Sequence, residues 1–423
     1  MAWLSVLSPV SIAMVLVFFF VSAWSLYNVP ILVAGIRNMR RSRKIRRSAG
    51  RKSLPSFSIV VPVKNERNVV GRLLTALSNL DYPEDKKEVI LVEDGSTDET
   101  ISICQKYAKG SKMDIKILRK PSSDGKPSAL NYGIAQAKGE IVGIFDADNV
   151  PARDALLNVC GFFGDPAVAA VQGRTSSINA DQNMLTKFIS HEETVWCEVY
   201  LRGKDVLNLF VYLKGSCQFI RRNVLEELNG FDEKALSEDM EFSARLQENG
   251  YKIRYAPNVQ SWQESPSDAR SFFWQRTRWF RGTMEIALRY GKLMSKPNVR
   301  NLDAELTLLG PFVLIAGLVS YLASFYTFLV PLSFDLLLRL VMQASGLVAT
   351  FTFLLCGLAL VFASNPRKVK SVLWIPFIYF YWSFQAFISF YAVMLIMLRR
   401  PRNWNKTEKI GVMNEKSKFS VCA

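Results

Sequence analysis

Long apolar segments at both ends of the chain limit its folding more than any other feature, because each is long enough to cross a bilayer. The first lies within residues 7–36 and includes the uncharged run VSIAMVLVFFFVSAWSLY. Three more cover residues 306–332, 336–363 and 372–398. About 20 apolar residues are enough to span the hydrocarbon core of a membrane. The sequence therefore predicts an integral membrane protein with a soluble middle.

A basic stretch follows the first apolar segment and predicts which side of the membrane holds the soluble middle. Residues 37–52 are rich in arginine and lysine and contain no acidic residue. Cytoplasmic flanks of membrane helices carry such an excess of positive charge, which also attracts anionic lipids. We expect residues 1–36 to form an uncleaved transmembrane anchor and residues 53–300 to lie in the cytoplasm, at the plasma membrane. A signal peptide is not favoured, because the apolar run is too long and lacks a basic leader and a cleavage site.

Residues 301–398 are predicted to form transmembrane or interfacial helices, and a basic tail follows at 399–423. The basic segment at 365–370 and this tail both favour the cytoplasmic side. Three full crossings after a cytoplasmic domain cannot place both there, so the number of crossings stays open. A re-entrant or interfacial segment would resolve the conflict. Arg339 favours such irregularity, because a charge at membrane depth is costly.

The chain carries a formal net charge of +16, and basic proteins bind nucleic acid, anionic lipid or phosphorylated substrates. Much of the excess charge is explained by the membrane flanks, and the sequence has no zinc finger or recognisable RNA-binding motif. We therefore expect no nucleic-acid partner. His191 is the one histidine, so a histidine-rich metal site or a Ser-His-Asp triad would depend on it alone.

Strand-like and helix-like segments alternate through the soluble middle. The expected strands cover residues 57–63, 88–94, 114–120 and 140–148. The expected helices cover residues 65–80, 97–109 and 128–137. Such alternation is typical of an α/β fold with a mostly parallel, Rossmann-like sheet and helices on both faces. In these sheets the ligand crevice lies beyond the carboxyl ends of the strands.

Three aspartates lie at the carboxyl ends of the expected strands. Asp94 ends the second strand, and Asp146 and Asp148 end the fourth in the run IVGIFDADN. Carboxylate oxygens at this edge can hold Mg2+ or Mn2+, and the ion can bridge to a diphosphate. The alternative is that these aspartates cap turns or helices. That alternative is stronger for Asp94, which is followed by Gly95, than for the pair.

Two further sequence patterns contain side chains that could take part in catalysis at the same edge of the sheet. Asp239, in SEDMEF, lies just before a helical run and can act as a general base, although alone it looks like an ordinary acidic first helical turn. The run WQRTRWFRG at 274–282 contains three arginines and two tryptophans. Arginine there can meet a diphosphate while tryptophan faces a sugar. The alternative is a membrane-adjacent helix with snorkelling arginines.

The ordered set VPVKNE, VEDGSTDE, DGKPSALNYG, FDADN, SED and QRTRW resembles the inverting glycosyltransferases of family 2. More narrowly, it resembles their membrane-embedded processive branch, which includes cellulose, chitin, hyaluronan and poly-N-acetylglucosamine synthases. The resemblance covers roughly residues 57–282 and the flanking membrane layout. It implies a GT-A fold, a nucleotide-sugar donor and a divalent cation. The tail segment NWNKTEK is similar to a cytoplasmic segment that follows the last membrane helix in related synthases.

The resemblance also implies roles for individual residues. The donor-binding residues are Pro62, Glu66, Asp94, Lys126, Asp146 and Asp148. The first three of these would contact the nucleoside, and Asp148 would bind Mg2+ or Mn2+ on the diphosphate. Asp239 corresponds to the catalytic base, which deprotonates an acceptor hydroxyl so that its attack inverts the anomeric carbon. Gln275, Arg278 and Trp279 would hold the acceptor sugar and steady the departing diphosphate.

The acceptor is less well defined by the sequence. Where the family has a Gly-Thr-Gly-like acceptor loop, this chain reads Lys214, Gly215, Ser216 and Cys217, which keeps a hydroxyl and loses the second glycine. The resemblance favours a growing polysaccharide made from UDP-glucose or UDP-N-acetylglucosamine. The alternative is a single transfer to a lipid, such as a diacylglycerol, a sphingolipid or a polyprenyl phosphate. A non-catalytic scaffold is not favoured, because it predicts the loss of an acidic position and all are present.

Overall fold

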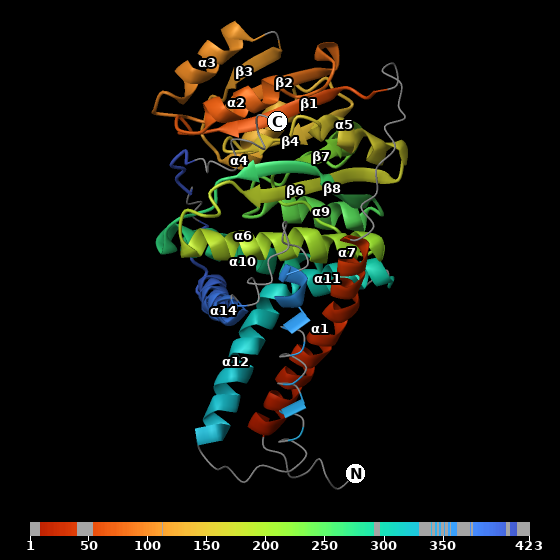
Figure 1. Cartoon of the computed structure of the whole chain (residues 1–423), viewed down its shortest axis with the longest axis vertical. Helices are drawn as coiled ribbons and strands as arrows, with labels where there is room; N and C mark the ends of the chain where they lie inside the picture. The colour runs from red at the N-terminus through yellow and green to blue at the C-terminus, as the bar shows by residue number, and fades with distance from the viewer. Residues whose placement is uncertain are drawn as a thin grey trace.

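An eight-stranded sheet forms the centre of the molecule (Figure 1), with the strand order β3-β2-β1-β4-β7-β6-β8-β5. The computed structural model describes residues 9–39, 54–111, 113–291, 297–329, 375–402 and 407–412, with residue 373 and scattered positions between 340 and 361. The strands are β1 (Phe57–Val63), β2 (Lys87–Glu93), β3 (Asp114–Arg119), β4 (Ile141–Ile144), β5 (Val150–Pro151), β6 (Val168–Ser177), β7 (Gln218–Arg221) and β8 (Lys252–Gln263).

The first four strands form the parallel half of the sheet, as the alternation predicts. β1 pairs in parallel with β2 and β4, and β2 pairs in parallel with β3. The connecting helices are α2 (Val70–Ser78), α3 (Thr100–Gly110) and α4 (Lys126–Ile134). The strand expected at 57–63 has those bounds, whereas the helix expected from residue 65 begins only at Val70. The predicted α/β class with a mostly parallel sheet is confirmed.

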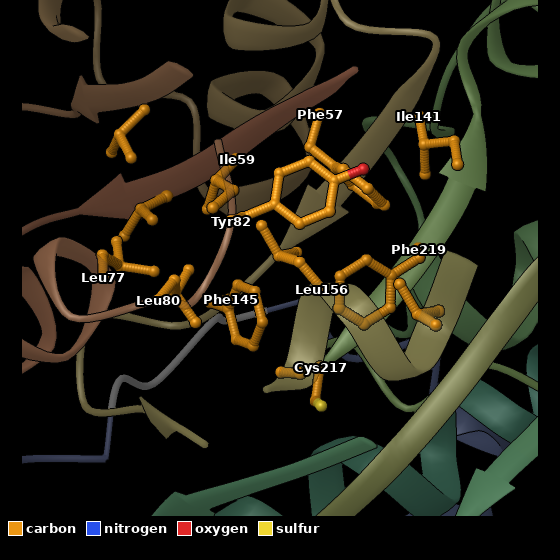
Figure 2. Close-up of a cluster of buried hydrophobic side chains, with 14 of the residues drawn as sticks. Phe57, Ile59, Leu77, Leu80, Tyr82, Ile141, Phe145, Leu156, Cys217 and Phe219 are labelled. Atoms are coloured by element: carbon orange, nitrogen blue, oxygen red, sulfur yellow. The ribbon is translucent and has the colours of Figure 1, made fainter. Parts of the chain in front are cut away.

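Side chains at alternate positions of β1 reach two separate cores. Phe57 and Ile59 pack in the first core with Leu77 of α2 and Phe219 of β7 (Figure 2). Val60 packs in the second core, which includes the apolar side chains of α4. Successive side chains of a strand point to opposite faces, so the apolar run FSIVVPV suits a strand that helices cover on both sides.

The other half of the sheet departs from simple alternation. β7 lies between β4 and β6 and is antiparallel to both. β6 and β8 are parallel to each other, and the short strand β5 pairs antiparallel with β8 at the edge. Because β7 runs against β4, Gln218 at its start pairs with Ile144 at the end of β4. The segment before β7, residues 214–217, therefore lies beside the aspartates that follow β4.

A layer of helices separates the sheet from the longest apolar helices (Figure 1). This layer includes α6 (Met184–Val195), α9 (Glu238–Glu248) and α10 (Ala269–Tyr290). Below it, α1 (Pro9–Met39) and α12 (Gly310–Leu329) run away from the sheet. In contrast, α14 (Ile375–Met397) is seen nearly end-on beside α10, so it lies across the direction of the other two.

Two of these helices are long and apolar enough to cross a membrane, over residues Ile12–Met39 of α1 and Phe380–Met397 of α14. A third candidate is α11 (Val299–Leu308) with the start of α12, a pair that is bent by 57°. A bend of this kind suits the broken or re-entrant segment that would resolve the conflict between the basic flanks. Arg339, the segment at 365–370 and most of the segment at 336–363 lie outside the described residues.

The N-terminal helix α1 packs so closely on residues 199–203 that two glycines are required. A Cβ atom on Gly203, in α7 (Arg202–Val206), would lie 2.0 Å from the carbonyl oxygen of Ile31. A Cβ atom on Gly35 would lie 2.0 Å from the carbonyl oxygen of Val199. Helix backbones approach each other this closely only where small residues meet. The helix α1 is therefore closely fitted to this part of the structure.

Replacement of Gly203 by alanine is expected to push α1 away from α7 and to lower the free energy of unfolding by about 1–3 kcal/mol, as overpacking does. Gly110→Ala is the matched control, because a Cβ atom there meets nothing within 4 Å. Thermal unfolding of the two variants in detergent measures the difference. Equal midpoints would contradict the close packing of α1.

Candidate active site

Lys126 is the centre of a cluster of charged side chains at the carboxyl edge of the sheet. It begins α4, and its Nζ lies 2.8 Å from Oδ1 of Asp146 and 3.2 Å from Oε1 of Glu238. The same Nζ donates a hydrogen bond of 3.0 Å to the carbonyl oxygen of Gly215. Burial opposes the charge, but the two carboxylates outweigh burial and raise the pKa of Lys126. The lysine is therefore a fixed cation in the predicted crevice.

Asp239, the predicted base, lies next to this cation. It is the second residue of α9, and its Oδ1 accepts a hydrogen bond of 2.8 Å from the backbone N of Met240. Gly215 has a φ of +78°, and a Cβ atom there would lie 3.1 Å from Oδ2 of Asp239 and 3.2 Å from Nζ of Lys126. Burial and the charge of Glu238 raise the pKa of Asp239 to about 7. A carboxylate with a pKa near neutrality is well suited to accept a proton.

Asp94 follows β2 and is held against the start of α4. Its Oδ2 accepts hydrogen bonds from the backbone N of Gly125 at 3.3 Å and from Oγ of Ser123 at 3.1 Å. Its Oδ1 is buried and has no hydrogen-bond partner among the described residues. A buried acceptor of this kind is costly unless a ligand donates to it. Pro62, near the end of β1, and Glu66, just beyond it, lie at the same edge.

Asp148, the second aspartate of the pair, contacts a residue from the far end of the chain. Nζ of Lys409 lies 2.7 Å from Oδ2 of Asp148, and the backbone N of Glu264 donates to the same oxygen at 3.0 Å. Burial raises the pKa of Asp148, but Lys409, this hydrogen bond and Arg72 outweigh burial and hold the pKa below its usual value. Asp148 is thus an ionised carboxylate that already has a cation beside it.

Glu264 holds the end of the chain in this position. Its Oε1 accepts from the backbone N of Ile410 at 2.7 Å, and its Oε2 accepts from that of Gly411 at 3.0 Å. Nζ of Lys409 also donates to the carbonyl oxygen of Glu264 at 2.5 Å. Gly411 has a φ of +82°, and a Cβ atom there would lie 2.7 Å from the carbonyl oxygen of Asn68. We call residues 409–412 the tail strap.

The residues of the QxxRW pattern lie on α10. Nη1 of Arg278 donates to the carbonyl oxygen of Leu236 at 3.5 Å, and its charge partly opposes the effect of burial on the pKa of Asp239. Trp279 is 37% exposed, and the guanidinium of Arg276 lies 4.5 Å from the centre of its ring. Gln275 is half-buried on the preceding turn. The helix therefore brings Arg278 within electrostatic reach of Asp239.

The departure in the acceptor-loop motif has a structural explanation. Oγ of Ser216 donates to Oδ1 of Asn149, and it accepts a hydrogen bond of 3.3 Å from the backbone N of Asp146. Ser216 is therefore buried behind the aspartate pair and supports the turn that carries it. The close approach of the backbone to Asp239 occurs at Gly215, which this chain keeps, and not at the position of the lost second glycine.

Asp146 and Asp148 are the residues that fit a divalent cation. In the part of the chain that the structure describes, no group of three or more His, Cys, Asp or Glu side chains surrounds a common ion position. Mg2+ keeps several waters and is commonly held by one or two carboxylates together with substrate phosphates, so a pair is sufficient. The ammonium group of Lys409 on Asp148 marks a position that attracts a cation.

Sequence reasoning missed the partners of Asp148. Glu264 lies just after β8 in no motif, and Arg72 lies on the exposed side of an amphipathic helical pattern. For Lys409 the one available signal was the similarity of NWNKTEK to a cytoplasmic segment of related synthases. That similarity did not predict the contact, because the contact joins the turn after β4 with a segment that lies beyond α14.

Comparison with known proteins identifies the family of the chain. The family described as "Glycosyltransferase like family 2" matches residues 55–282, which is more than half of the chain. A probable glycosyltransferase, YdaM, of Bacillus subtilis (strain 168) is 34% identical over 63% of this chain and 64% of its own length. A beta-monoglucosyldiacylglycerol synthase of Nostoc sp. is 35% identical over 58% of this chain and 52% of its own length. A poly-beta-1,6-N-acetyl-D-glucosamine synthase of Staphylococcus epidermidis is 30% identical over 55% and 56%.

The chain thus spans between about half and two thirds of the length of these relatives. Among solved structures, a mannosyltransferase from Pyrobaculum calidifontis in complex with GDP-Man and Mn2+ is similar in fold, with a TM-score of 0.58 and 19% identity. The similarity covers 92% of this chain and all of that one. The chain therefore belongs to the glycosyltransferase family 2, and it has the GT-A fold.

Proposed function

We propose that this protein is an inverting glycosyltransferase that moves a sugar from a nucleotide sugar to an acceptor hydroxyl at the cytoplasmic face of the plasma membrane. The observation that carries the proposal is the cluster of Lys126, Asp146 and Asp239. In this cluster the ammonium group of Lys126 lies between Asp146, which would face the donor, and Asp239, the predicted base. The favoured donors are UDP-glucose and UDP-N-acetylglucosamine.

Donor binding is assigned to the edge formed by β1, β2 and the start of α4. Pro62, Glu66 and Asp94 would contact the nucleoside, and the buried Oδ1 of Asp94 would accept a hydrogen bond from it. Lys126 would lie beside the diphosphate, held in place by Asp146. A phosphate group at this position would also face the N-terminal end of α4, where helix dipoles favour anions.

The metal site is assigned to Asp148, with Asp146 beside it. Mg2+ or Mn2+, when bound there with the diphosphate, would supply positive charge to the leaving group. Asp148 is ionised in the present arrangement, as a metal ligand must be. For the metal ion to bind Asp148, Lys409 of the tail strap would have to move away from this carboxylate.

Asp239 would act as the base in the transfer step. Its carboxylate takes the proton of the acceptor hydroxyl, and the oxygen attacks the anomeric carbon from the side opposite the diphosphate. The bond from this carbon to the diphosphate oxygen breaks, and the nucleoside diphosphate leaves with the bonding electrons. Arg278 would stabilise the charge that develops on it. Gln275 and Trp279 would hold the acceptor, because an indole gives the apolar face of a sugar a flat surface.

Two acceptor classes have support from relatives. A growing polysaccharide, which the membrane helices would export, is supported by the similarity to a poly-beta-1,6-N-acetyl-D-glucosamine synthase. A membrane lipid is supported by the similarity to a beta-monoglucosyldiacylglycerol synthase.

Product size tests the proposal and separates the two acceptor classes. The purified protein in nanodiscs would receive Mg2+ or Mn2+ and each of a panel of radiolabelled nucleotide sugars. A solvent-extractable labelled product identifies a lipid acceptor, and a high-molecular-weight product that a glycosidase digests identifies a polysaccharide. Absence of transfer from every donor, with folded protein, would contradict the proposed function.

Replacement of Asp239 by asparagine is expected to lower kcat by about 10²–10⁴, because a general base typically contributes that factor. Asp81→Asn is the matched control, since Asp81 is an exposed residue paired with Arg153. Steady-state release of the nucleoside diphosphate measures both variants. Normal turnover by the Asp239 variant would refute the assignment of the base.

The pH dependence of kcat/KM offers a separate test of the same residue. The base must be ionised, and its pKa is about 7, so kcat/KM is expected to fall as the pH drops below about 7. After burial, the charge of Glu238 is the next cause that raises this pKa. Glu238→Gln should therefore lower the pKa of Asp239 and shift the acidic limb of the profile to lower pH. A shift to higher pH would contradict this electrostatic account.

Replacement of Lys409 by methionine should reduce the Mg2+ concentration required for half-maximal activity several-fold, because the ammonium group no longer competes for Asp148. Lys138→Met is the matched control, because Lys138 is exposed and precedes β4, at the end of the strand opposite to Asp148. Titration of activity with Mg2+ at saturating donor measures the effect. An unchanged Mg2+ requirement would show that the tail strap does not compete with the ion.

A further inference from the structure

A cavity of about 450 Å³ lies between α10 and α14, on the membrane side of the predicted base. From α10 it is lined by Trp274, Thr277, Arg278 and Arg281. Their spacing of three, four and seven residues places them on one face of the helix. Of the three residues of the QxxRW pattern, Arg278 lines this cavity.

The opposite wall is apolar and comes from the helix that the membrane assignment places in or on the bilayer. Tyr391 and Leu395, one turn apart near the end of α14, face the cavity. Leu236, from the segment before α9, closes the side toward the active site. Leu236 is three residues before Asp239, and its carbonyl oxygen accepts a hydrogen bond from Arg278. The cavity therefore connects the end of an apolar helix with the catalytic edge.

The charged part of the lining is entirely positive. Arg278, Arg281 and Arg400 all line the cavity. The nearby carboxylate of Glu285 contacts Nε of Arg281 and Nε of Arg402, each at 2.9 Å, so two arginines share one negative charge. Arg281 also donates to the carbonyl oxygens at the end of α14, which fixes the turn that carries Arg400. The walls thus combine aromatic and aliphatic surface with an excess of guanidinium groups.

We propose that this cavity is part of the acceptor site, beside Gln275 and Trp279 on α10, and that the acceptor is a membrane lipid whose head group carries both a phosphate and a free hydroxyl. The proposal rests on the proposed function and narrows its acceptor class. Arginine is the side chain that best matches the geometry of a phosphate. The apolar wall suits the glycerol backbone and the start of the acyl chains. A volume of this size holds a head group.

The requirement for a hydroxyl comes from the base. A lipid that attacked through its phosphate would use an oxygen that is already ionised, and it would be repelled by the carboxylates of Glu238 and Asp239. A hydroxyl needs a base, and Asp239 lies close to Leu236 at the end of the cavity. The hydroxyl proton passes to Asp239, its oxygen forms the new bond to the anomeric carbon, and the nucleoside diphosphate leaves with the electrons of the broken bond.

Nanodiscs of phosphatidylcholine doped with one further lipid test the head-group chemistry. The added lipids are phosphatidylglycerol, which has a phosphate and free hydroxyls; diacylglycerol, which has a hydroxyl and no phosphate; and phosphatidic acid, which has a phosphate and no head-group hydroxyl. With labelled UDP-glucose or UDP-N-acetylglucosamine, we expect label on phosphatidylglycerol, roughly tenfold less on diacylglycerol, and inhibition by phosphatidic acid. The tenfold preference corresponds to one charged hydrogen bond.

Each other result overturns the proposal in a recognisable way. Equal labelling of diacylglycerol and phosphatidylglycerol would mean that the cavity does not bind the phosphate of the head group. A labelled polymer would mean that the acceptor is a glycan, while the proposed transferase function would stand. No transfer and no release of nucleoside diphosphate in any nanodisc would refute the proposed function itself.

A pair of arginine variants tests whether the lipid phosphate binds in the cavity. Arg400→Gln should raise the KM for phosphatidylglycerol roughly tenfold, with kcat and the KM for the donor unchanged, because a charged hydrogen bond to the phosphate is lost. Arg399→Gln is the matched control: it removes the same charge next to the cavity, and Arg399 does not line it. Equal effects of the two variants would mean that the lipid is attracted by general surface charge, and they would overturn the assignment of the cavity.

Discussion

The burial of one ammonium group holds the catalytic edge together. Lys126 begins α4, Asp146 follows β4 and Glu238 begins α9, so a single side chain joins two consecutive elements to a third that comes much later in the chain. A charge removed from water is costly unless it is paired, and loss of one partner of a buried pair is strongly destabilising. The pKa of Asp239 is raised to about 7 by burial and by the charge of Glu238, and the charge of Lys126 partly opposes this rise. Structure and chemistry therefore depend on the same cation.

The helix α10 connects the catalytic edge of the sheet with the apolar helix α14. One of its faces lines the cavity beside Leu236, and Arg276 on another side forms a buried ion pair with Glu192 of α6. Tyr381 of α14 donates to the same carboxylate at 2.7 Å. The aromatic and basic character of the QRTRW run thus serves two purposes. Arg278 lines the cavity that we propose for the acceptor, and Arg276 helps to fasten α6 to α10 and α14.

The sequence was sufficient where a pattern is local, and insufficient where a contact is distant. The apolar run of β1 and the placement of Asp146 and Asp148 at a strand end follow from alternation and from the geometry of parallel sheets. The reversed strand β7 did not follow, because a four-residue strand has too little pattern to reveal its direction. The contact of Lys409 with Asp148 did not follow either, since it depends on the path of α14 and of the chain beyond it. The predicted roles of individual residues await the variants described above.

The tail strap gives Asp148 a counter-ion that is part of the polypeptide. A tethered group has a local concentration that is determined by geometry and not by supply, so Lys409 is always present, whereas a soluble cation must be acquired together with its diphosphate. A donor complex would therefore arrive at a site that is already neutralised and ordered. For the same reason, a deletion that included Lys409 would leave the Asp148 carboxylate without the counter-ion that the polypeptide provides.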